Sequence, residues 1–555
     1  MNPIFKDGNQ KTCPPFQTSS VLSAEVESGN IEYKTRLDPS SSDRFNHLVT
    51  QMKWRLAESA GHGEAIYELG VRDDGSLLGL SHDELESSLM NLRAMAEELD
   101  AEVSIIREIY CGNGRKIIET LVRKRWANQN SFVEVRIATV GDHEAGKSTL
   151  LGVMTQGEPD NGRGKARLNL FRHRHEIESG HTSHIAIEVL GYDSAGRALN
   201  YSGNFASWEE IVTASSKVIT FIDCCGLPHY TKHTIRGLTG HSPDYACAMV
   251  PANTNEISHV TQDHLSICHA LGVPLFLLVT KLDIATKVRL RHTLKRLYTI
   301  LKESSPSRVP FIVQDQETVV AASQKFSKET ITPIFFTSSV TKMGISLLHS
   351  FLNLLQKPPI SQSATDSGSV FQIEDVYDLA GTGLVVGGMN KAGRINVDDT
   401  MWIGPISDKF YKVTINSIHR QRIPTKCLIA GQAGAMSISS SVAIKPKKGM
   451  VLLQSGEPPP IPHTGFMVDA LCLSGILVRG CQAVAHCGSV RAVVKVVSIS
   501  PETIVKLEKL HSGQKARVRF DMVNSSEWIS LGENVLVISA GPIKVSGQVT
   551  ELYIN

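Results

Sequence analysis

The sequence lacks the features that mark secreted and membrane proteins. Its ten cysteines include no C-x-x-C pair, and they are therefore predicted to be reduced thiols. Residues 1–20 contain no apolar run of signal-peptide type, and the longest apolar segment, VPLFLLV at 273–279, has the length of a strand. We therefore expect an intracellular, cytoplasmic protein with no membrane role.

The chain also lacks a large net charge and an internal repeat. Lys and Arg total 57 against 55 for Asp and Glu, so the formal net charge is +2. This balance excludes a surface that is attracted as a whole to nucleic acid or membrane, and any RNA contact must come from local basic segments. At 555 residues the chain is too long for one hydrophobic core, which predicts several domains.

Composition and periodicity divide the chain into segments. The polar start has no sustained periodicity and is predicted to be disordered. Alternating strand-like and helical runs from residue 132 predict a doubly wound α/β domain, and short strands with Gly turns after two Pro-rich breaks predict two antiparallel β-barrels. The predicted segments are a disordered tail (1–43), an N-terminal α+β module (44–130), the doubly wound domain (131–357), a linker (358–369), a first barrel (370–455) and a second barrel (456–555).

The N-terminal module combines strand-like runs with one well-marked helix. Ser81 and Glu84 have the spacing of a capping box, which predicts that a helix begins there. Leu85, Leu89 and Leu92 recur on one face of that helix. The runs EAIYELGV, EVSIIREIY and RKIIETLV are predicted strands, and together these elements predict an α+β fold.

The most specific motif is GDHEAGKS at 141–148, which follows the strand-like VEVRIATV and precedes the helical TLLGVM. In a G-x-x-x-x-G-K-[ST] loop the glycines let backbone N–H groups surround phosphates, the lysine reaches the β and γ oxygens, and the hydroxyl binds Mg²⁺. The alternative is a chance Gly-rich turn, which the later motifs disfavour. The predicted nucleotide-binding residues of this loop are Gly141, Asp142, His143, Glu144, Ala145, Gly146, Lys147, Ser148 and Thr149.

Residues that would sense a γ-phosphate follow in chain order. Asp223 ends the strand-like KVITFID, where its carboxylate could hold a Mg²⁺-bound water, and the N–H of Gly226 could meet the γ-phosphate. Thr182 in SGHTSHI is the predicted switch threonine that coordinates Mg²⁺. The predicted catalytic residues are Lys147, Thr182, Asp223 and Gly226, and the predicted metal ligands are Ser148, Thr182 and, through water, Asp223.

The segment TKLD at 280–283 predicts that the base is guanine. Asp283 could accept hydrogen bonds from guanine N1–H and the exocyclic amine, whereas adenine offers no donor at N1, so an ATP-dependent transferase is disfavoured. Further along, TSSV at 337–340 could bring backbone donors to the guanine O6. The predicted guanine-side residues are Thr280, Lys281, Asp283, Ser338, Ser339 and Val340. The doubly wound domain is therefore predicted to be a P-loop G domain that binds GTP or GDP with Mg²⁺.

These motifs resemble the GTP-binding protein 1 and 2 subfamily of elongation-factor-type translational GTPases. The resemblance rests on GDHEAGKSTLLGVMTQGE, DNGRGKARLNLFRHRHEIESGHTS, TGH at 239–241 and TKLD, and QGEPDNGRGKARLNLFRH is most similar to the second type. It covers about residues 45–555. It implies the fold of the elongation factor that delivers tRNA, GTPase activity, and association with the ribosome and with a tRNA-like or Pelota-type rescue factor.

Three positions depart from the pattern of such GTPases. Thr280 stands where many have Asn, which this subfamily tolerates, and Glu144 replaces the usual Asp of the phosphate loop. Leu227 occupies the position of the catalytic histidine that aligns the attacking water. Because leucine cannot form a hydrogen bond, we predict slow or partner-dependent hydrolysis, with a GTP-binding scaffold that does not hydrolyse GTP as the alternative. His229 could take the role only if Pro228 bent the switch into an unusual path.

Two basic segments are candidate RNA contacts, and each could equally be a solvated surface. Metal binding by His173 and His175 in the first segment is disfavoured because no third ligand follows at a suitable spacing. Cys224 and Cys225, beside the phosphate site, are predicted to be packing residues rather than redox-active thiols. The basic candidates are Arg167, Arg172 and Arg174 in the first segment, and His486, Arg491, Lys495, Lys515, Arg517 and Arg519 in the second.

Overall fold

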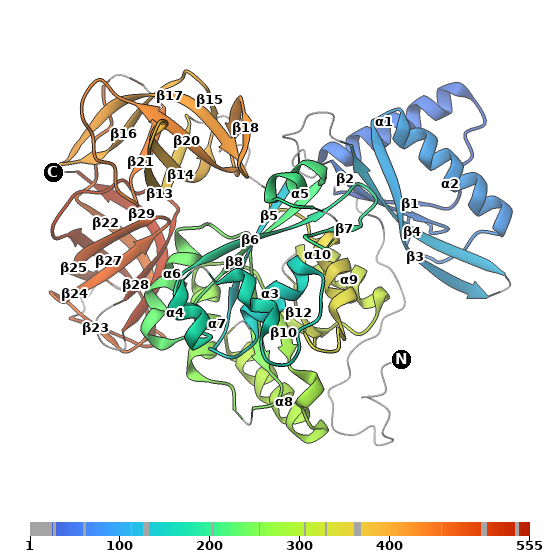
Figure 1. The fold of residues 1–555 in the computed structure, drawn as a ribbon, viewed down its shortest axis with the longest axis horizontal. Helices are drawn as coiled ribbons and strands as arrows, with labels where there is room; N and C mark the ends of the chain where they lie inside the picture. The colour runs from blue at the N-terminus through green and yellow to red at the C-terminus, as the bar shows by residue number, and fades with distance from the viewer. Residues whose placement is uncertain are drawn as a thin grey trace.

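The computed structural model of the chain describes residues 25, 29–58, 63–112, 114–125, 132–171, 173–202, 205–254, 256–304, 307–327, 330–359, 368–454, 456, 458–500, 508–538 and 543–554. These residues form an N-terminal module, a G domain and two barrels, which confirms the predicted fold class. Figure 1 shows the N-terminal module on the opposite side of the G domain from the barrels. Among the described residues, no helix is both long and apolar enough to cross a membrane.

The N-terminal module is a four-stranded sheet with two helices. The strand order is β1–β2–β4–β3, with β1 and β2 parallel and the other pairs antiparallel. The predicted capping box is present, because the Ser81 hydroxyl accepts from the Glu84 N–H and the Glu84 carboxylate accepts from the Ser81 N–H. The elements are β1 (Ile31–Lys34), α1 (Ser42–Glu58), β2 (Glu64–Leu69), α2 (His82–Glu97), β3 (Ala101–Gly112) and β4 (Arg115–Lys124).

The module begins earlier than predicted. Strand β1 lies within the tail that the sequence predicted to be disordered, and it pairs with β2 from Ile31 opposite Ile66 onward. Its buried Glu32 accepts a hydrogen bond from Arg55 of α1 at 2.6 Å. A strand of four residues is too short to show a periodicity in the sequence. The residues that stabilise it lie in the next helix, α1, and in β2 beyond that helix. Residues 1–24 and 26–28 of the predicted tail lie outside the described part of the chain.

The G domain is built on an eight-stranded sheet of order β11–β12–β10–β9–β5–β8–β6–β7. The first six strands are parallel, and β6 and β7 form an antiparallel edge. VEVRIATV and KVITFID coincide with β5 and β8, as predicted, whereas the edge strands β6 and β7 were not predicted. The strands are β5 (Val133–Val140), β6 (Ala186–Tyr192), β7 (Ala198–Leu199), β8 (Lys217–Asp223), β9 (Tyr245–Pro251), β10 (Leu275–Thr280), β11 (Val309–Ile312) and β12 (Ile331–Phe336).

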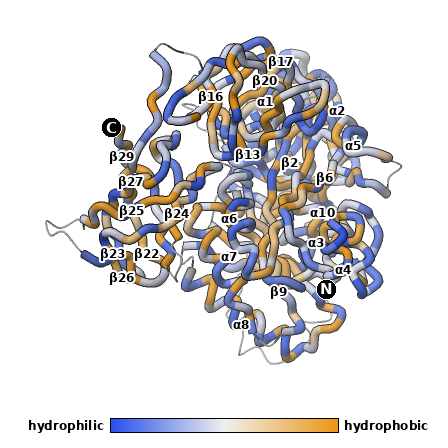
Figure 2. Tube along the Cα trace, turned by 60° about the vertical axis from the view of Figure 1, so that its left-hand side comes forward, coloured by the Kyte–Doolittle hydropathy of each residue, from blue (hydrophilic) through white to orange (hydrophobic). Residues whose placement is uncertain are grey.

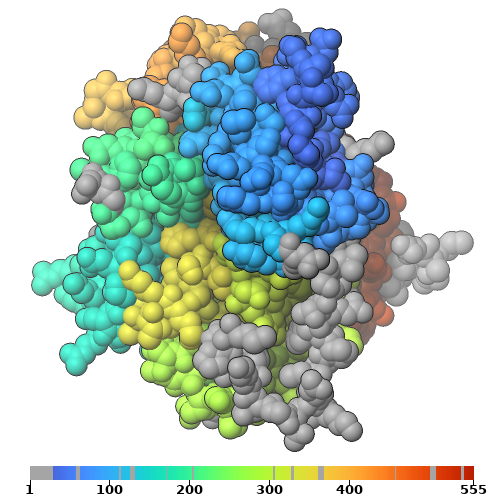
Figure 3. All heavy atoms as spheres, turned by 90° about the vertical axis from the view of Figure 1, so that its right-hand side faces the viewer, coloured from blue at the N-terminus to red at the C-terminus, as the bar shows by residue number. Residues whose placement is uncertain are grey.

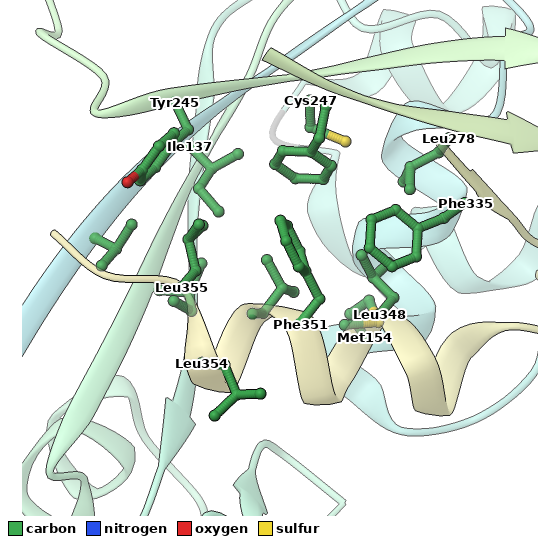
Figure 4. Packing of buried hydrophobic residues seen from close by; sticks show 14 of the residues in the cluster. Ile137, Met154, Tyr245, Cys247, Leu278, Phe335, Leu348, Phe351, Leu354 and Leu355 are labelled. Carbon is green, nitrogen blue, oxygen red and sulfur yellow. The ribbon is translucent and has the colours of Figure 1, made fainter. Parts of the chain in front are cut away.

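Helices pack against this sheet and complete its hydrophobic core. The α-helices are α3 (Lys147–Gln156), α4 (Arg174–Ser179), α5 (Trp208–Ala214), α6 (Thr231–Thr239), α7 (His259–Ala270), α8 (Lys287–Ser304), α9 (Gln316–Ser327) and α10 (Ile345–Leu354). Figure 4 shows Phe351 of α10 beside Phe335 of the sheet, with ring centroids 4.9 Å apart. The same cluster contains Ile66 and Leu121 of the N-terminal module, so the two domains share one core.

A buried ion-pair network also joins the N-terminal module to the G domain. The Glu64 carboxylate accepts hydrogen bonds from Arg123 at 2.8 Å and from Lys217 of β8 at 3.1 Å. Burial raises the pKa of Glu64, but the two cations outweigh it and the net shift is downward. Figure 3 shows the module, in blue, lying against the yellow end of the G domain. Breaking such a pair leaves an uncompensated buried charge, so the module is firmly attached.

The two C-terminal domains are closed six-stranded antiparallel barrels. The first closes through β16–β21–β13–β14–β20–β17 with a β16–β17 pairing, and the second through β22–β27–β25–β24–β28–β29. Hydrophobic and hydrophilic residues alternate along β25, where alternate side chains are buried, and Figure 2 shows this change of colour along the barrel strands. Residues 360–367 of the predicted linker lie outside the described residues.

The barrel strands have the following bounds. In the first barrel they are β13 (Val370–Leu379), β14 (Gly383–Ala392), β15 (Arg394–Asn396), β16 (Thr400–Ile406), β17 (Lys409–Arg420), β18 (Ile423–Thr425), β19 (Cys427–Ile429), β20 (Ala433–Ser439) and β21 (Val451–Gln454). In the second they are β22 (Gly465–Ser474), β23 (Ile476–Val478), β24 (Gln482–Cys487), β25 (Val490–Ser500), β26 (Lys509–His511), β27 (Lys515–Met522), β28 (Asn534–Ile538) and β29 (Lys544–Tyr553).

Candidate nucleotide-binding site

The phosphate loop connects the end of β5 to the start of α3. Gly141 has a φ of 134°, and a Cβ at this position would lie 2.5 Å from the Met249 carbonyl oxygen, so only glycine fits. Gly146 has a φ of 92° and directly precedes Lys147, the first residue of α3. The N-terminal N–H groups of α3 therefore open onto the loop, which is the arrangement that binds phosphate.

Lys147 lies folded back onto the phosphate loop. Its ammonium donates to the carbonyl oxygens of Gly141 at 3.1 Å and Asp142 at 2.8 Å. Burial lowers its pKa, and the nearby Asp223 only partly opposes this effect. A buried cation with carbonyl partners gains stability from an anion, so phosphate oxygens would improve its surroundings.

Ser148, Thr182 and Asp223 come together although they lie far apart in the sequence. The Ser148 hydroxyl donates to Asp223 Oδ2 at 2.6 Å and lies 2.8 Å from the Thr182 hydroxyl. Thr139 holds the other carboxylate oxygen of Asp223 at 2.8 Å. Burial raises the pKa of Asp223, although Lys147 and these hydroxyls oppose it. All three converging groups are oxygen donors, which suits a hard cation.

The segment after β8 brings Gly226 and Leu227 to the phosphate loop. A Cβ on Gly226 would lie 2.5 Å from both the His143 nitrogen and the Lys147 ammonium, so a side chain is excluded there. Leu227 lines the same pocket, but His229 does not; it is exposed on the 3₁₀ turn Pro228–Tyr230. The structure therefore supplies no water-aligning group from His229.

Cys224 and Cys225 are fully buried next to Asp223. Burial raises the pKa of the Cys225 thiol to about 12 and that of Cys224 well above its usual range. Both thiols therefore stay protonated and unreactive at neutral pH. This agrees with their predicted role as packing residues.

The guanine-side residues form a second group at the end of β10. The Thr280 hydroxyl donates to the Ala145 carbonyl at 2.7 Å and so ties this strand to the phosphate loop. Ser338 donates to the Asp283 carboxylate at 2.6 Å, which fixes the orientation of that acid. Lys281 has a positive φ of 59°. The side chain of Asp283 thus lines the pocket as a fixed acceptor.

A pocket of about 520 Å³ lies over these elements. Its predicted lining residues are His143, Glu144, Gly146, Lys147, Ser148, Thr149, Thr182, Gly226, Leu227, Thr280, Lys281, Asp283, Ser339 and Val340. The other lining residues are Asp160, Gly162, Arg163, Gly164, Arg167, Gly180, His181 and Ile284. None of them was predicted from the sequence to bind the nucleotide, although Arg167 was a candidate RNA contact. The remaining predicted residues, Gly141, Asp142, Ala145, Asp223 and Ser338, stand behind the lining and hold it in place.

The DNGRG segment, 160–164, forms part of that wall, which the sequence did not predict. The buried Asp160 carboxylate accepts the N–H groups of Gly162 at 2.8 Å, Gly164 at 3.0 Å and Ala166 at 2.9 Å. The Asp160 N–H in turn donates to the Ser339 carbonyl at 2.9 Å, next to the guanine side. An Asp followed by glycines two and four residues later is a turn signal that could have identified this loop.

The histidine-rich segment is organised by buried Glu176. Its carboxylate accepts the N–H groups of His173 at 3.2 Å and Ser183 at 2.7 Å. The ligand atoms of His175, Glu176 and His184 lie within 4.8 Å of one another, in a group that does not include His173 and that the sequence did not predict. The Ser183 hydroxyl bonds to all three at 2.7, 2.8 and 2.9 Å, so these contacts satisfy the group as it stands.

The first basic segment divides between the pocket and the surface. Arg167 lines the nucleotide pocket, so its neighbour there would be the nucleotide and not the predicted RNA. Arg174 is 92% exposed and pairs with Glu178 at 3.0 Å. Arg172 lies outside the described residues. RNA contact by this segment stays a prediction.

The predicted basic face of the second barrel is less basic than expected. His486 is buried, and burial lowers its pKa to about 4, so it presents no charge at the surface. Arg517 bonds to Glu551 at 2.6 Å and Arg519 bonds to Asp521 at 3.0 Å. Asp521 on the same strand and Glu551 on β29 thus offset part of the positive charge.

Fold and site together define a P-loop GTPase of the elongation-factor type. Residues 134–357 match the Elongation factor Tu GTP binding domain. The GTPase-like domain of Ski7 from S. cerevisiae, solved with GTP bound, is similar in fold, with a TM-score of 0.56, 13% identity, and coverage of 76% of this chain and 98% of that chain.

Two curated relatives are similar over nearly the whole chain. GTP-binding protein 2 of Homo sapiens is 41% identical over 98% of this chain and 90% of its own length. GTP-binding protein 1 of Xenopus laevis is 38% identical over 94% of this chain and 79% of its own length. The chain belongs to the GTP-binding protein 1 and 2 family, as its motifs indicated.

Proposed function

We propose that this chain is a GTP-dependent switch that acts on ribosomes in the cytoplasm, either in tRNA-like delivery or in rescue of stalled translation with a Pelota-type factor. The observation that supports it best is that the candidate γ-phosphate sensors, Thr182 and Gly226, lie at the phosphate loop in one pocket with Asp283. A site that contacts both the base and the γ-phosphate distinguishes GTP from GDP, which is what a switch requires.

The pocket supports binding of the nucleotide as follows. The N-terminus of α3 and Lys147 would hold the phosphates, and Asp283 would accept hydrogen bonds from the guanine edge. Ser148 and Thr182 would hold Mg²⁺ directly and Asp223 through water, since their oxygens converge. When bound, Mg²⁺ neutralises charge that develops on the phosphate oxygens.

Release of the γ-phosphate would be transmitted through the segment after Gly226. Helix α6 of this segment carries Arg236, which donates to the Glu374 carbonyl of the first barrel at 2.7 Å and to Asp375 at 3.1 Å. His241, in the TGH sequence that follows α6, lies 2.9 Å from the Glu374 carboxylate. A change at Gly226 could therefore reach the first barrel through α6 and His241, and through that barrel the surface that would face a partner.

Hydrolysis would be slow or dependent on a partner. Leu227 offers no group to the attacking water, yet the residues that bind phosphate and metal are all present. A ribosomal group supplied in trans would then complete the site. The second candidate function, a scaffold that binds GTP without significant hydrolysis, is favoured by Leu227 alone.

Co-sedimentation with polysomes tests the switch. We expect binding in the presence of a non-hydrolysable GTP analogue and release with GDP, and no binding for Lys147→Ala, which removes the phosphate contact. Single-turnover hydrolysis with and without ribosomes then separates the two candidates. Stimulation by ribosomes supports the switch, whereas tight GTP binding with neither polysome association nor hydrolysis would leave the scaffold.

A further inference from the structure

Leu227 offers the nucleotide pocket no hydrogen-bonding side chain, but two histidines line the same pocket. His143 enters from the phosphate loop, and His181 enters from the segment before Thr182. Their rings meet edge to face, with centroids 5.9 Å apart. The two histidines therefore line the pocket from two separate segments that border the phosphate site.

His143 is held in one tautomer by its neighbour. Its ring Nδ1 lies 2.9 Å from Asp142 Oδ1, and the His143 N–H donates to the same oxygen at 2.8 Å. A carboxylate on Nδ1 places the ring proton there, which leaves the Nε2 lone pair free to accept a hydrogen bond. Partial burial raises the pKa of Asp142, but hydrogen bonds from Ser258 and His143 outweigh it, so the carboxylate stays charged.

The backbone places His143 beside the predicted γ-phosphate contact. The His143 N–H donates to the Gly226 carbonyl oxygen at 3.2 Å. The packing is so close that a Cβ on Gly226 would lie 2.5 Å from the His143 nitrogen. His143 is therefore in direct backbone contact with the residue that would meet the γ-phosphate, and both His143 and Leu227 line the pocket.

We propose that His143 positions the attacking water in place of the missing histidine at 227, with Asp142 orienting its ring. This assignment rests on the proposed function, since it concerns hydrolysis of the GTP bound there. His143 Nε2 accepts a hydrogen bond from the water. The water oxygen forms a bond to the γ-phosphorus, the bond from that phosphorus to the bridging oxygen breaks, and its electron pair stays on GDP. The water proton passes to the released inorganic phosphate.

The histidine that is nearer in sequence does not compete for this role. His229 is exposed on its 3₁₀ turn and is absent from the pocket lining, whereas 42% of the His143 side chain is exposed, toward the pocket.

Single-turnover GTP hydrolysis by the full-length chain, with and without ribosomes, tests the assignment. We expect His143→Val to lower the rate by about ten- to 100-fold while the affinity for a fluorescent GTP analogue changes by less than about threefold. His143→Gln should retain part of the rate because its amide can still bind water.

The matched control is His292→Val on the exposed face of α8, which should behave as wild type. Adding Leu227→His to His143→Val should restore hydrolysis, because it returns a ring nitrogen to the pocket. A wild-type rate in His143→Val would overturn the assignment while leaving the GTPase switch intact. Tight GTP binding with no hydrolysis by the wild-type chain, even with ribosomes, would overturn both.

Discussion

Glu374→Leu should loosen the contact between the G domain and the first barrel. The Glu374 carboxylate is buried, accepts from Arg136 of β5 at 3.4 Å, and lies 2.9 Å from His241 Nδ1. Two nitrogens of the buried Arg136 guanidinium, Nε and Nη1, have no hydrogen-bond partner among the described residues. Removing Glu374 therefore takes away the only acid that bonds to this guanidinium there.

The size of the effect follows from the geometry. Breaking a buried ion pair by removing one partner costs about 3–5 kcal/mol. The 3.4 Å contact is long, and Glu134 and Asp244 also stabilise the charge of Arg136, so the lower end, about 3 kcal/mol, applies. Since about 1.4 kcal/mol corresponds to a factor of ten, the interface should open roughly 100-fold more often.

Hydrogen exchange measures this opening directly. Protection of β13 and α6, which meet at this interface, should fall by about two orders of magnitude, while α2 of the N-terminal module should be unaffected. Lys448→Ala is the control, because its exposed pair with Asp375 contributes less than about 1 kcal/mol. Replacing both partners by apolar residues, Glu374→Leu with Arg136→Met, should recover most of the protection. Wild-type exchange in Glu374→Leu would refute the reasoning.

Three further predictions concern the base, the γ-phosphate and a buried acid. Asp283→Asn should weaken GTP by roughly 2–4 kcal/mol, because an amide presents a donor to guanine donors, and should favour xanthosine triphosphate; unchanged selectivity by calorimetry would contradict the base assignment. Gly226→Ala, whose Cβ would collide with His143, should lower the affinity for GTP relative to GDP about tenfold, and an unchanged ratio would argue against a γ-phosphate contact. Burial, together with Glu119, raises the pKa of Glu68 to about 8. The folded state then binds the extra proton, so stability falls as pH rises from about 4.5 to 8, and Glu68→Gln should remove a loss of about 5 kcal/mol in denaturant titrations; an equally steep pH dependence in the variant would exclude Glu68 as its cause.

The nucleotide site was predictable because its chemistry is local in sequence. The loop 141–148 and TKLD each place their functional groups within a few residues of a strand end, so the motif and the fold specify the same geometry. The parallel strands were predictable for a related reason, since buried runs such as β9 and β10 are apolar or nearly so along their length.

The parts that could not be predicted depend on contacts between distant segments. Strand β1 is only four residues long and forms because β2 offers an edge, and β6 and β7 are stabilised as an antiparallel edge of a parallel sheet. Asp160 reaches the guanine side only through the Ser339 carbonyl. From the sequence of its own strand, His486 is predicted to be an exposed basic residue, but the closed barrel buries it. The domain boundaries other than the start of the N-terminal module stay predictions.

If His143 aligns the water, control of hydrolysis lies in a different part of the G domain. Its partner Asp142 donates its N–H to the Thr261 hydroxyl of α7 at 3.2 Å, and Asp263, two residues further along α7, pairs with Lys544 of the second barrel at 2.6 Å. A partner bound to that barrel therefore has a path to the Asp142–His143 pair that avoids Leu227. The ion pair is partly exposed and weak by itself, so it can adjust α7 without locking it. Stimulation by a partner would then require movement of α7 rather than reorientation of the segment after β8, because Leu227 in that segment has no hydrogen-bonding group to bring to the water.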